Sequence, residues 1–170
     1  LTVIGLTGTN GKTTVSYLLE NMLAQAGLSA GVIGTVNYRF GQHEVPASRT
    51  TPESLDLQRI LADMRAKGVT HVVMEVASHG LELNRVDACW FDAAAFTNLT
   101  QDHLDFHGDM ESYWASKKSL FTRLLPRGPK GDRAVAVINR DDPRGQDLCN
   151  ELPGTRPLIT CGQSPGNTVW

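Results

Sequence analysis

The sequence predicts an α/β fold built on a mostly parallel, doubly wound sheet with helices on both faces. Short apolar segments alternate along the chain with segments whose apolar residues recur at helical spacing, as expected for strands joined by crossover helices. A glycine-rich turn links the first apolar segment to the first helical one. The chain has 170 residues, of which 41% are hydrophobic, and this is enough for one domain with a substantial core.

The expected strands are short and are separated by glycine, proline or polar residues. They are residues 1–6, 29–33, 69–76, 93–96, 134–138 and 158–161. In addition, residues 35–45 alternate in polarity around Gly41 and Gln42, which predicts a hairpin that Pro46 ends.

Three longer helices are expected between these strands. The first follows the glycine-rich turn, ends at Gly27 and should bury one stripe of side chains. That stripe is Val15, Leu18, Leu19, Met22, Leu23 and Ala26. The second should begin with Thr51 as its N-cap and Pro52 in its first turn, and end at Gly68. The third follows Asp109.

The glycine-rich turn has the pattern of a phosphate-binding loop. Backbone N–H groups near Gly8 and Gly11 can surround phosphate oxygens, Lys12 can reach the β- and γ-phosphates, and the Thr13 hydroxyl can bind Mg²⁺. The full pattern has an earlier glycine where this chain has Leu6, so a glycine-rich helix cap is the alternative. The position between a strand and a helix favours the phosphate loop and a nucleoside triphosphate ligand.

Composition narrows the possible partners and the location of the protein. The net charge is −2, the isoelectric point is near 6.2, and the chain has no basic tract and no membrane-length apolar run. We therefore expect neither nucleic acid nor a membrane as partner, and we expect a monomer. Three cysteines without metal-type spacing indicate reduced thiols in the cytoplasm. Because the chain opens on a strand without an initiator methionine, we expect it to be part of a longer protein.

Glu75 interrupts an otherwise apolar strand segment. A carboxylate within a buried parallel strand is costly unless a positive group meets it. At the end of a strand beside the phosphate loop, Mg²⁺ is the expected partner. The alternative is an edge position at which Glu75 faces solvent.

A polar loop at residues 97–108 follows another expected strand and is rich in aspartate and histidine. Ligands of open α/β sheets gather beyond the carboxyl ends of strands, so this loop should reach the same pocket. His103 is the best candidate for a metal ligand because it lies near the strand end between acidic neighbours. Asp105 and His107 could equally be structural.

The helix after Asp109 places one lysine among its apolar residues. With about 100° per residue, Lys117 lies within roughly 10° of the centre of the apolar face, whereas Lys118 lies about 90° away. Burial lowers the pKa of a lysine, and a neutral amine can react with carbon dioxide to form a carbamate, a carboxylate-like metal ligand. The alternatives are an ammonium that escapes at the helix end or that meets Glu75 or a phosphate.

Several motifs occur in the order found in Mur ligases, and the chain resembles the central ATP-binding domain of that family. They are residues 7–14, 50–52, 75–81, 97–105, 113–117 and 139–142. The resemblance extends to about Gly162 and is strongest to members that form the UDP-N-acetylmuramoyl-tripeptide. It implies that residues 1–170 form a P-loop NTPase-like domain, without the family's N-terminal UDP-binding and C-terminal amino-acid-binding domains.

The resemblance implies an ATP-dependent carboxylate–amine ligase of peptidoglycan synthesis. Such an enzyme adds L-lysine or meso-diaminopimelate to UDP-N-acetylmuramoyl-L-alanyl-D-glutamate through an acyl phosphate. The residues implied to bind the triphosphate are Gly8, Thr9, Asn10, Gly11, Lys12, Thr13 and Thr14. Thr13 and Glu75 would hold one Mg²⁺, and His103 and a carbamylated Lys117 a second.

The resemblance also assigns the remaining ligand contacts. Asn139 would recognise adenine. The implied contacts of the muramoyl-dipeptide are Thr50, Thr51, Ser78 and Arg85. Two other interpretations stay open: a related amide ligase of the folylpolyglutamate or cyanophycin synthetase type, and a nucleotide-binding module without catalysis.

Overall fold

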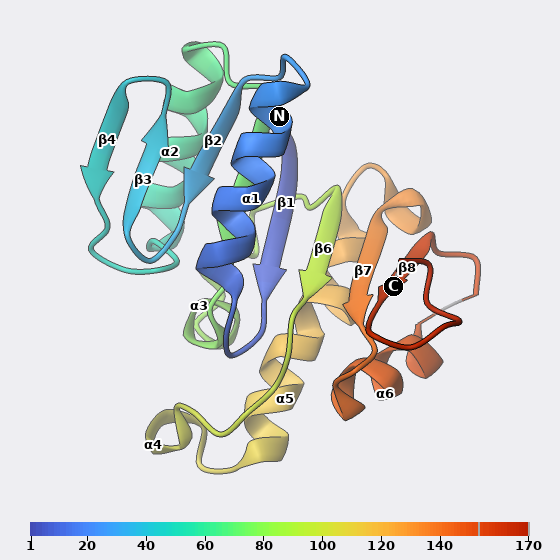
Figure 1. Cartoon of the computed structure of the whole chain (residues 1–170). Coiled ribbons are helices and arrows are strands. Elements are labelled where there is room, and N and C mark those ends of the chain that lie inside the picture. The colour runs from blue at the N-terminus through green and yellow to red at the C-terminus, as the bar shows by residue number, and fades with distance from the viewer. Residues whose placement is uncertain (153, 170) are drawn as a thin grey trace.

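A computed structural model of the chain describes residues 1–152 and 154–169, and these residues form one eight-stranded sheet (Figure 1). The strand order is β4-β3-β2-β5-β1-β6-β7-β8. The strands are β1 (Thr2–Thr7), β2 (Ala30–Ile33), β3 (Asn37–Phe40), β4 (His43–Pro46), β5 (His71–Glu75), β6 (Ala93–Phe96), β7 (Val135–Asn139) and β8 (Leu158–Cys161). Only the β2-β3 and β3-β4 pairs of this described sheet are antiparallel, so the mostly parallel sheet is confirmed.

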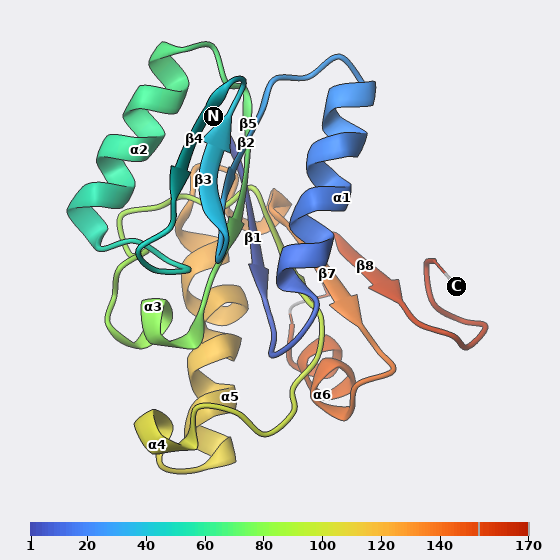
Figure 2. The ribbon, with the colours of Figure 1, turned by 60° about the vertical axis from the view of Figure 1, so that its left-hand side comes forward.

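Helices lie on both faces of the sheet, as the sequence predicts (Figure 2). Helix α1 (Lys12–Gln25) covers one face, and α2 (Ser54–Ala66) and α5 (Met110–Ser119) lie on the other. The remaining helical segments are α3 (Ser78–Glu82), α4 (Leu104–His107), α6 (Pro143–Glu151), the π-helical η1 (Leu120–Leu124) and the 3₁₀ turns η2 (Leu125–Arg127) and η3 (Gly131–Arg133).

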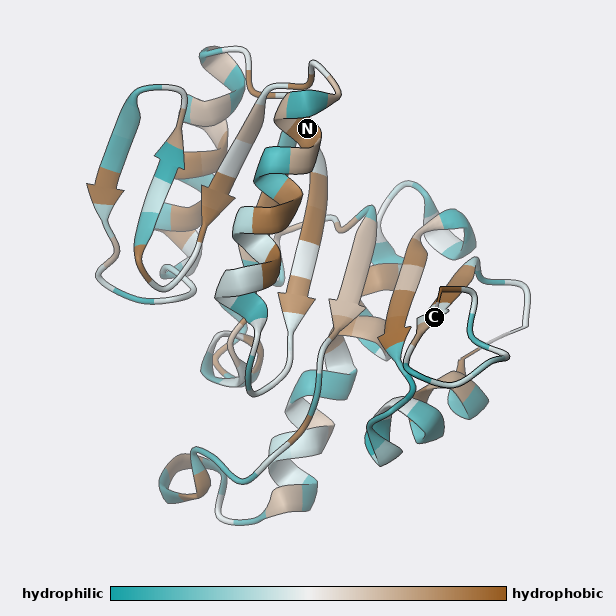
Figure 3. Cartoon of the chain, in the orientation of Figure 1, coloured by the Kyte–Doolittle hydropathy of each residue, from teal (hydrophilic) through white to brown (hydrophobic). Residues whose placement is uncertain are grey.

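Two hydrophobic clusters hold these layers together. Under α1, the buried Leu6, Val32 and Val73 pack against side chains of the helix. The larger cluster on the opposite face joins the sheet to α2, α5, η1 and α6 and includes Leu57 and Trp114. Apolar residues accordingly concentrate in the central strands, whereas α6 is largely hydrophilic along its length (Figure 3). No helix in the described part of the chain is long and apolar enough to cross a membrane.

Two local expectations are wrong. Leu18 and Met22 of α1 are 59% and 66% exposed, because the helix contacts the sheet through the narrower stripe of Val15, Leu19 and Leu23. Thr51 does not cap α2, which begins at Ser54 after Glu53. The Thr51 hydroxyl instead donates to the Glu75 carbonyl oxygen and accepts the Ala77 N–H, so it ties the start of α2 to the end of β5.

The expected hairpin and the third long helix are confirmed. Strands β3 and β4 pair around Gly41, and Pro46 is the last residue of β4. Asp109 caps α5 by accepting the Ser112 N–H. The α-helix then gives way to the π-helical η1 after Ser119.

Candidate functional site

The glycine-rich turn lies at the carboxyl edge of the sheet, between β1 and α1. Gly8 has a φ of 140° and Gly11 a φ of 86°, a backbone region that favours glycine. A Cβ on Gly8 would lie 2.0 Å from the Thr97 hydroxyl oxygen, so the turn packs directly on the segment after β6. The Asn10 N–H donates to the Asn98 side chain at 2.9 Å. Contacts from the segment directly after β6 therefore hold the turn in place.

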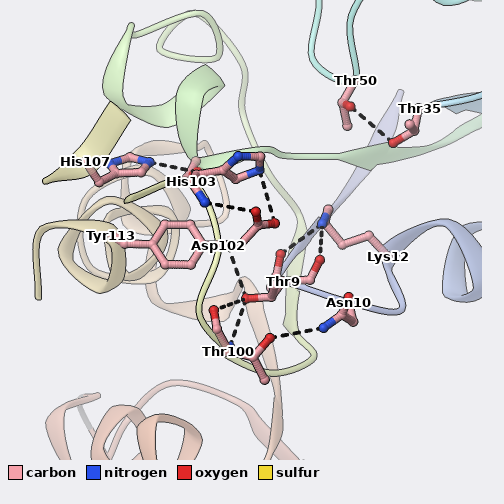
Figure 4. A network of polar contacts seen from close by, with 12 residues as sticks. Thr9, Asn10, Lys12, Thr35, Thr50, Thr100, Asp102, His103, His107 and Tyr113 are labelled. Carbon is pink, nitrogen blue, oxygen red and sulfur yellow. Dashed lines mark hydrogen bonds and ion pairs between the residues drawn. The ribbon is translucent and has the colours of Figure 1, made fainter. Parts of the chain in front are cut away.

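Lys12 begins α1 and folds back over this turn. Its Nζ donates to the carbonyl oxygens of Gly8 and Thr9, each at 2.9 Å (Figure 4). Burial lowers the pKa of Lys12, although the charges of Glu75 and Asp102 act in the opposite direction. The ammonium therefore lies against the loop backbone, close to the N–H groups that would bind an anionic ligand. Thr14 lies in the first turn of α1 and is exposed.

Glu75 ends β5, which lies inside the sheet between β1 and β2, so the edge position is wrong. Its side chain is 1% exposed and accepts three hydrogen bonds. The donors are the Thr13 hydroxyl at 3.0 Å, the Thr35 N–H at 3.1 Å and the Thr35 hydroxyl at 3.0 Å. Among the described residues, no lysine or arginine forms an ion pair with Glu75. A buried carboxylate next to a threonine hydroxyl suits a hard divalent cation.

Thr35 is a site residue that the sequence interpretation missed. It follows β2, and its contact with Glu75 depends on β2 and β5 being neighbours in the sheet. A Cβ on the preceding Gly34 would lie 2.4 Å from the Glu75 carboxylate, so glycine there leaves space for the carboxylate. The available signal was position, because a polar residue directly after a parallel strand faces the same edge as the phosphate loop.

Lys117 points into the protein, as the helical spacing predicts. The residue is 1% exposed, and its Nζ donates to the Gly8 carbonyl oxygen at 2.9 Å. The same nitrogen lies 4.4 Å from the centre of the Tyr113 ring. Burial, and secondly the charge of Lys12, lower the pKa of Lys117 to about 7. Lys118 faces outward and pairs with Glu151 at 2.9 Å.

Two of the alternatives for Lys117 are wrong for this structure, whereas an ammonium that meets a bound phosphate stays open, because Nζ lies against the phosphate loop. The ammonium does not escape at the helix end, and its hydrogen-bond acceptor is a loop carbonyl and not Glu75. With a lowered pKa, the lysine has a substantial neutral fraction near pH 7, which is the form that reacts with carbon dioxide.

Three histidines cluster with one another, and two of them contact Tyr113. His103, with a φ of 53°, has its Nε2 3.4 Å from the Asp102 carboxylate, and its ring centre lies 6.1 Å from that of Tyr113. His107 forms a hydrogen bond with the Ser78 hydroxyl at 2.9 Å. The rings of His79 and His103 meet edge to face with centres 4.7 Å apart. Figure 4 shows His103, His107 and Tyr113 on one side of the loop residues Thr9 and Lys12.

In the described residues, no group of three or more histidine, cysteine, aspartate or glutamate side chains forms a ready metal site. His103 and the neighbouring Asp102 carboxylate therefore do not make a complete site for a second cation on their own. A carbamate on Lys117 would supply two additional oxygens in this region. Tyr113, which the sequence interpretation counted only among apolar residues, connects Lys117 to the loop through its hydroxyl, 3.1 Å from that of Thr9.

The side chains expected to bind the acceptor substrate adjoin Glu75. Thr50 and Thr35 share a hydrogen bond of 3.1 Å between their hydroxyls. Arg85 is 8% exposed, donates to the Thr51 carbonyl oxygen at 3.3 Å and pairs with Glu53 at 2.9 Å. Ser78 begins α3.

Asn139 ends β7, at the carboxyl edge of the same sheet. Its amide nitrogen donates to the Thr97 carbonyl oxygen at 2.8 Å, and its oxygen accepts the Asp141 N–H. Thr97 also donates to the Asn10 carbonyl oxygen of the phosphate loop, so Asn139 is connected to that loop through Thr97.

Fold and site together define a class of protein: α/β nucleotide-binding domains with a phosphate loop and a carboxylate at the end of a neighbouring strand. The chain belongs to the Mur ligase family, because the family model for the Mur ligase middle domain matches residues 6–170.

The chain is also similar in sequence to individual ligases. A 2,6-diaminopimelate ligase of Geobacter metallireducens is 53% identical over 98% of this chain and 32% of its own length. A ligase of the same name from Geobacter sulfurreducens is 55% identical over 94% of this chain and 31% of its own length. The full name of both is UDP-N-acetylmuramoyl-L-alanyl-D-glutamate–2,6-diaminopimelate ligase. The chain thus spans about a third of the length of these relatives.

Solved structures of other ligases have a similar fold. A UDP-N-acetylmuramoyl-L-alanyl-D-glutamate–2,6-diaminopimelate ligase superposes with a TM-score of 0.83 at 32% identity, covering 98% of this chain and 33% of the other. The MurF ligase of Thermotoga maritima, solved with ADP, gives a TM-score of 0.68 at 28% identity, again over 98% of this chain and 33% of the other. A folylpolyglutamate/dihydrofolate synthase of Yersinia pestis shares the fold at 24% identity, with a TM-score of 0.66 and coverage of 94% and 42%.

Proposed function

We propose that this chain is the central, ATP-binding domain of a three-domain ligase that adds an amino acid to UDP-N-acetylmuramoyl-L-alanyl-D-glutamate in the cytoplasm. The observation that carries the proposal is the convergence of Lys12, Glu75 and Lys117 on the phosphate loop, in a chain about half identical to ligases of that name. The names of these relatives favour diaminopimelate over lysine as the amino acid.

The loop residues supply the nucleotide contacts. Backbone N–H groups from Gly8 to Thr13 would bind the triphosphate, and Lys12 would leave the carbonyl oxygens of Gly8 and Thr9 to meet it. Asn10 and Thr14 would complete the loop, and Asn139 would contact adenine. Bound ATP supplies the phosphoryl group that turns a carboxylate into an acyl phosphate, which an amine can attack.

Two groups of side chains would hold Mg²⁺. The first is Thr13 and Glu75, whose oxygens already lie 3.0 Å apart. The second is His103 with a carbamylated Lys117. The Lys117 ammonium would first lose one proton, and the neutral amine would then bond to the carbon of carbon dioxide and release a second proton, so that a cation is replaced by an anion beside the phosphoryl group. The two Mg²⁺ cations would neutralise the negative charge of the phosphoryl group, so that the anionic carboxylate of the acceptor could approach it.

The acceptor substrate would bind on the Glu75 side of the loop. Arg85 offers a charge for its carboxylates, and the hydroxyls of Thr50 and Ser78 offer hydrogen bonds. The Thr51 hydroxyl is already bonded to the Glu75 carbonyl oxygen and the Ala77 N–H, so Thr51 would contribute by holding this segment in place. The rival folate-type ligase shares the fold alone with this chain. The high identity to diaminopimelate ligases also weighs against a module that has lost catalysis.

The test is a ligation assay with the full-length protein, ATP, Mg²⁺ and UDP-N-acetylmuramoyl-L-alanyl-D-glutamate. We expect amide formation with diaminopimelate, no glutamate addition to a folate, and no turnover by Lys12→Ala although that variant stays folded. Glutamate addition to a folate without amide formation on the UDP substrate would refute the proposal, as would full ATP turnover by Lys12→Ala.

A further inference from the structure

A serine and a histidine from two separate short helices meet beside the phosphate loop. The Nε2 atom of His107, at the end of α4, lies 2.9 Å from the hydroxyl oxygen of Ser78, the first residue of α3. Ser78 is 1% exposed, whereas His107 is partly exposed. The two residues are 29 positions apart in the sequence. Their contact therefore depends on how α4 packs against α3 and α5, and not on local chain geometry.

Packing fixes the imidazole of His107 in this position. Its ring centre lies 5.1 Å from that of Tyr113, 4.8 Å from that of Phe106 and 5.7 Å from that of His79. Its backbone N–H donates to the His103 carbonyl oxygen at 3.0 Å. A ring held from several sides presents Nε2 to Ser78 in one orientation.

The backbone around Ser78 is equally fixed. Its carbonyl oxygen accepts the Ser116 hydroxyl at 2.9 Å, and the N–H of the preceding Ala77 donates to Thr51. The remaining freedom of Ser78 is the direction of its single hydroxyl hydrogen. That direction depends on whether Nε2 of His107 donates or accepts.

The two cases have opposite consequences for an anionic ligand. If Nε2 accepts, the serine hydrogen points at the histidine, and the hydroxyl can offer a carboxylate only lone pairs. If Nε2 carries a proton and donates, the serine hydrogen is free to bond to a carboxylate, which can only accept hydrogen bonds.

We propose that His107 is a positioning residue that donates to the Ser78 hydroxyl and thereby directs its hydrogen toward a carboxylate of the UDP-muramoyl-dipeptide. This inference rests on the proposed function and extends it to a residue that does not itself touch the substrate. It predicts an effect on recognition of the acceptor substrate and none on the phosphate loop, which His107 does not contact through a hydrogen bond in the described residues.

The test compares two substitutions of equal size in the full-length protein. His107→Gln keeps a donor N–H near the position of Nε2, whereas His107→Glu offers only acceptors at neutral pH. We expect His107→Gln to retain a KM for the UDP substrate close to that of the unmodified protein. His107→Glu should raise that KM about 10-fold, the usual effect of one lost hydrogen bond to a charged group. The KM for ATP should stay unchanged in both.

A double-mutant comparison separates positioning from a structural role. Because His107 acts through Ser78, His107→Glu should add little to the loss in kcat/KM already caused by Ser78→Ala. His79→Phe, which keeps an aromatic ring in the same cluster, is the matched control and should leave the KM for the UDP substrate unchanged.

The outcomes distinguish this inference from the proposed function. Equal KM values for His107→Gln and His107→Glu, or fully additive losses in the double variant, would overturn the role of His107 while the unmodified protein still ligates. An unmodified protein that does not join an amino acid to the UDP substrate would refute the proposed function and this inference with it.

Discussion

Lys117 has an environment that lysines seldom occupy. It is 1% exposed, and among residues 1–152 and 154–169 its ammonium has one hydrogen-bond acceptor, the Gly8 carbonyl oxygen. In the described residues, no carboxylate lies within ion-pair distance of it. The charged form therefore loses most of its hydration without full compensation, and this is why its pKa falls to about 7. A modification that removes the positive charge would relieve this cost.

The lowered pKa predicts how stability depends on pH. The pKa of Lys117 is about 7 in the folded chain and about 10.4 in an unfolded one. Between these values the unfolded state binds more protons, so the free energy of unfolding rises with pH, by up to about 1.4 kcal/mol per pH unit from this group. Urea denaturation in buffer free of carbon dioxide, at pH 7, 8 and 9, measures the slope.

Replacement of Lys117 by methionine should remove that contribution. We expect Lys117→Met to be more stable than the unmodified chain near pH 7, with a difference that shrinks as the pH approaches 10.5. Lys12 titrates in the same direction, so part of the slope will remain. The control is Lys118→Met, which should keep the full slope. Identical slopes for all three proteins would contradict the buried position of Lys117.

At the scale of elements, the phosphate loop is shaped by the segment that follows β6. The backbone N–H of Thr9 donates to the Asn98 carbonyl oxygen at 2.8 Å. The Thr97 hydroxyl donates to the Asn10 carbonyl oxygen at 2.7 Å. Gly8 makes this close approach possible because it has no Cβ. The loop and the segment after β6 therefore form one structural unit.

This contact predicts different costs for two glycine substitutions. Gly11→Ala places a methyl group where no atom lies within 4 Å, so only backbone strain of about 1 to 2 kcal/mol is expected. Gly8→Ala adds overpacking against Thr97, which we expect to cost a further 1 to 3 kcal/mol, roughly. Gly8→Ala should also lose binding of a fluorescent ATP analogue. Equal melting temperatures for the two variants would show that the loop does not depend on this contact.

Sequence reasoning predicted the features that depend on local periodicity. It placed β6 and β8 at the residues where the structure has them, and it oriented Lys117 from helical spacing alone. It could not predict that Thr35 binds Glu75, because that contact requires the order of strands in the sheet. It misassigned Thr51 because a threonine before a proline suits an N-cap, while the folded chain uses its hydroxyl to connect β5 with α2.

The exposure of Leu18 and Met22 illustrates another limit. Helical spacing identifies which residues share a face, but the width of the buried stripe depends on the surface against which the helix packs. The contact between His107 and Ser78 could not be predicted from the sequence either, since it arises from the packing of α4 on its neighbours.

At the scale of the whole molecule, one sheet carries both hydrophobic clusters. Leu6 and Val73 belong to the cluster under α1, while Val72 and Met74 of the same β5 belong to the opposite one. Neighbouring residues of one strand thus pack against helices on opposite faces of the sheet. If the helices of either face separated from the sheet, apolar side chains of these shared strands would be exposed to water.

We therefore expect residues 1–170 to unfold in a single cooperative transition, without ligase activity of their own. Far-UV and near-UV circular dichroism should give coincident midpoints in guanidinium chloride. Two separated midpoints would show that the layers unfold independently. Amide formation by residues 1–170 alone would contradict the proposal that further domains bind the incoming amino acid.

The proposed ligase depends on the charge of one side chain, and the most direct measurement is chemical rescue at Lys117. In the full-length protein, Lys117→Ala should nearly abolish ligation, and acetate should partly restore it by placing a carboxylate in the vacated space. Lys118→Ala, whose lysine pairs with Glu151 at the surface, should have little effect. Equal losses from both substitutions, or no rescue by any short carboxylic acid, would show that Lys117 acts as a plain cation and would contradict the carbamate.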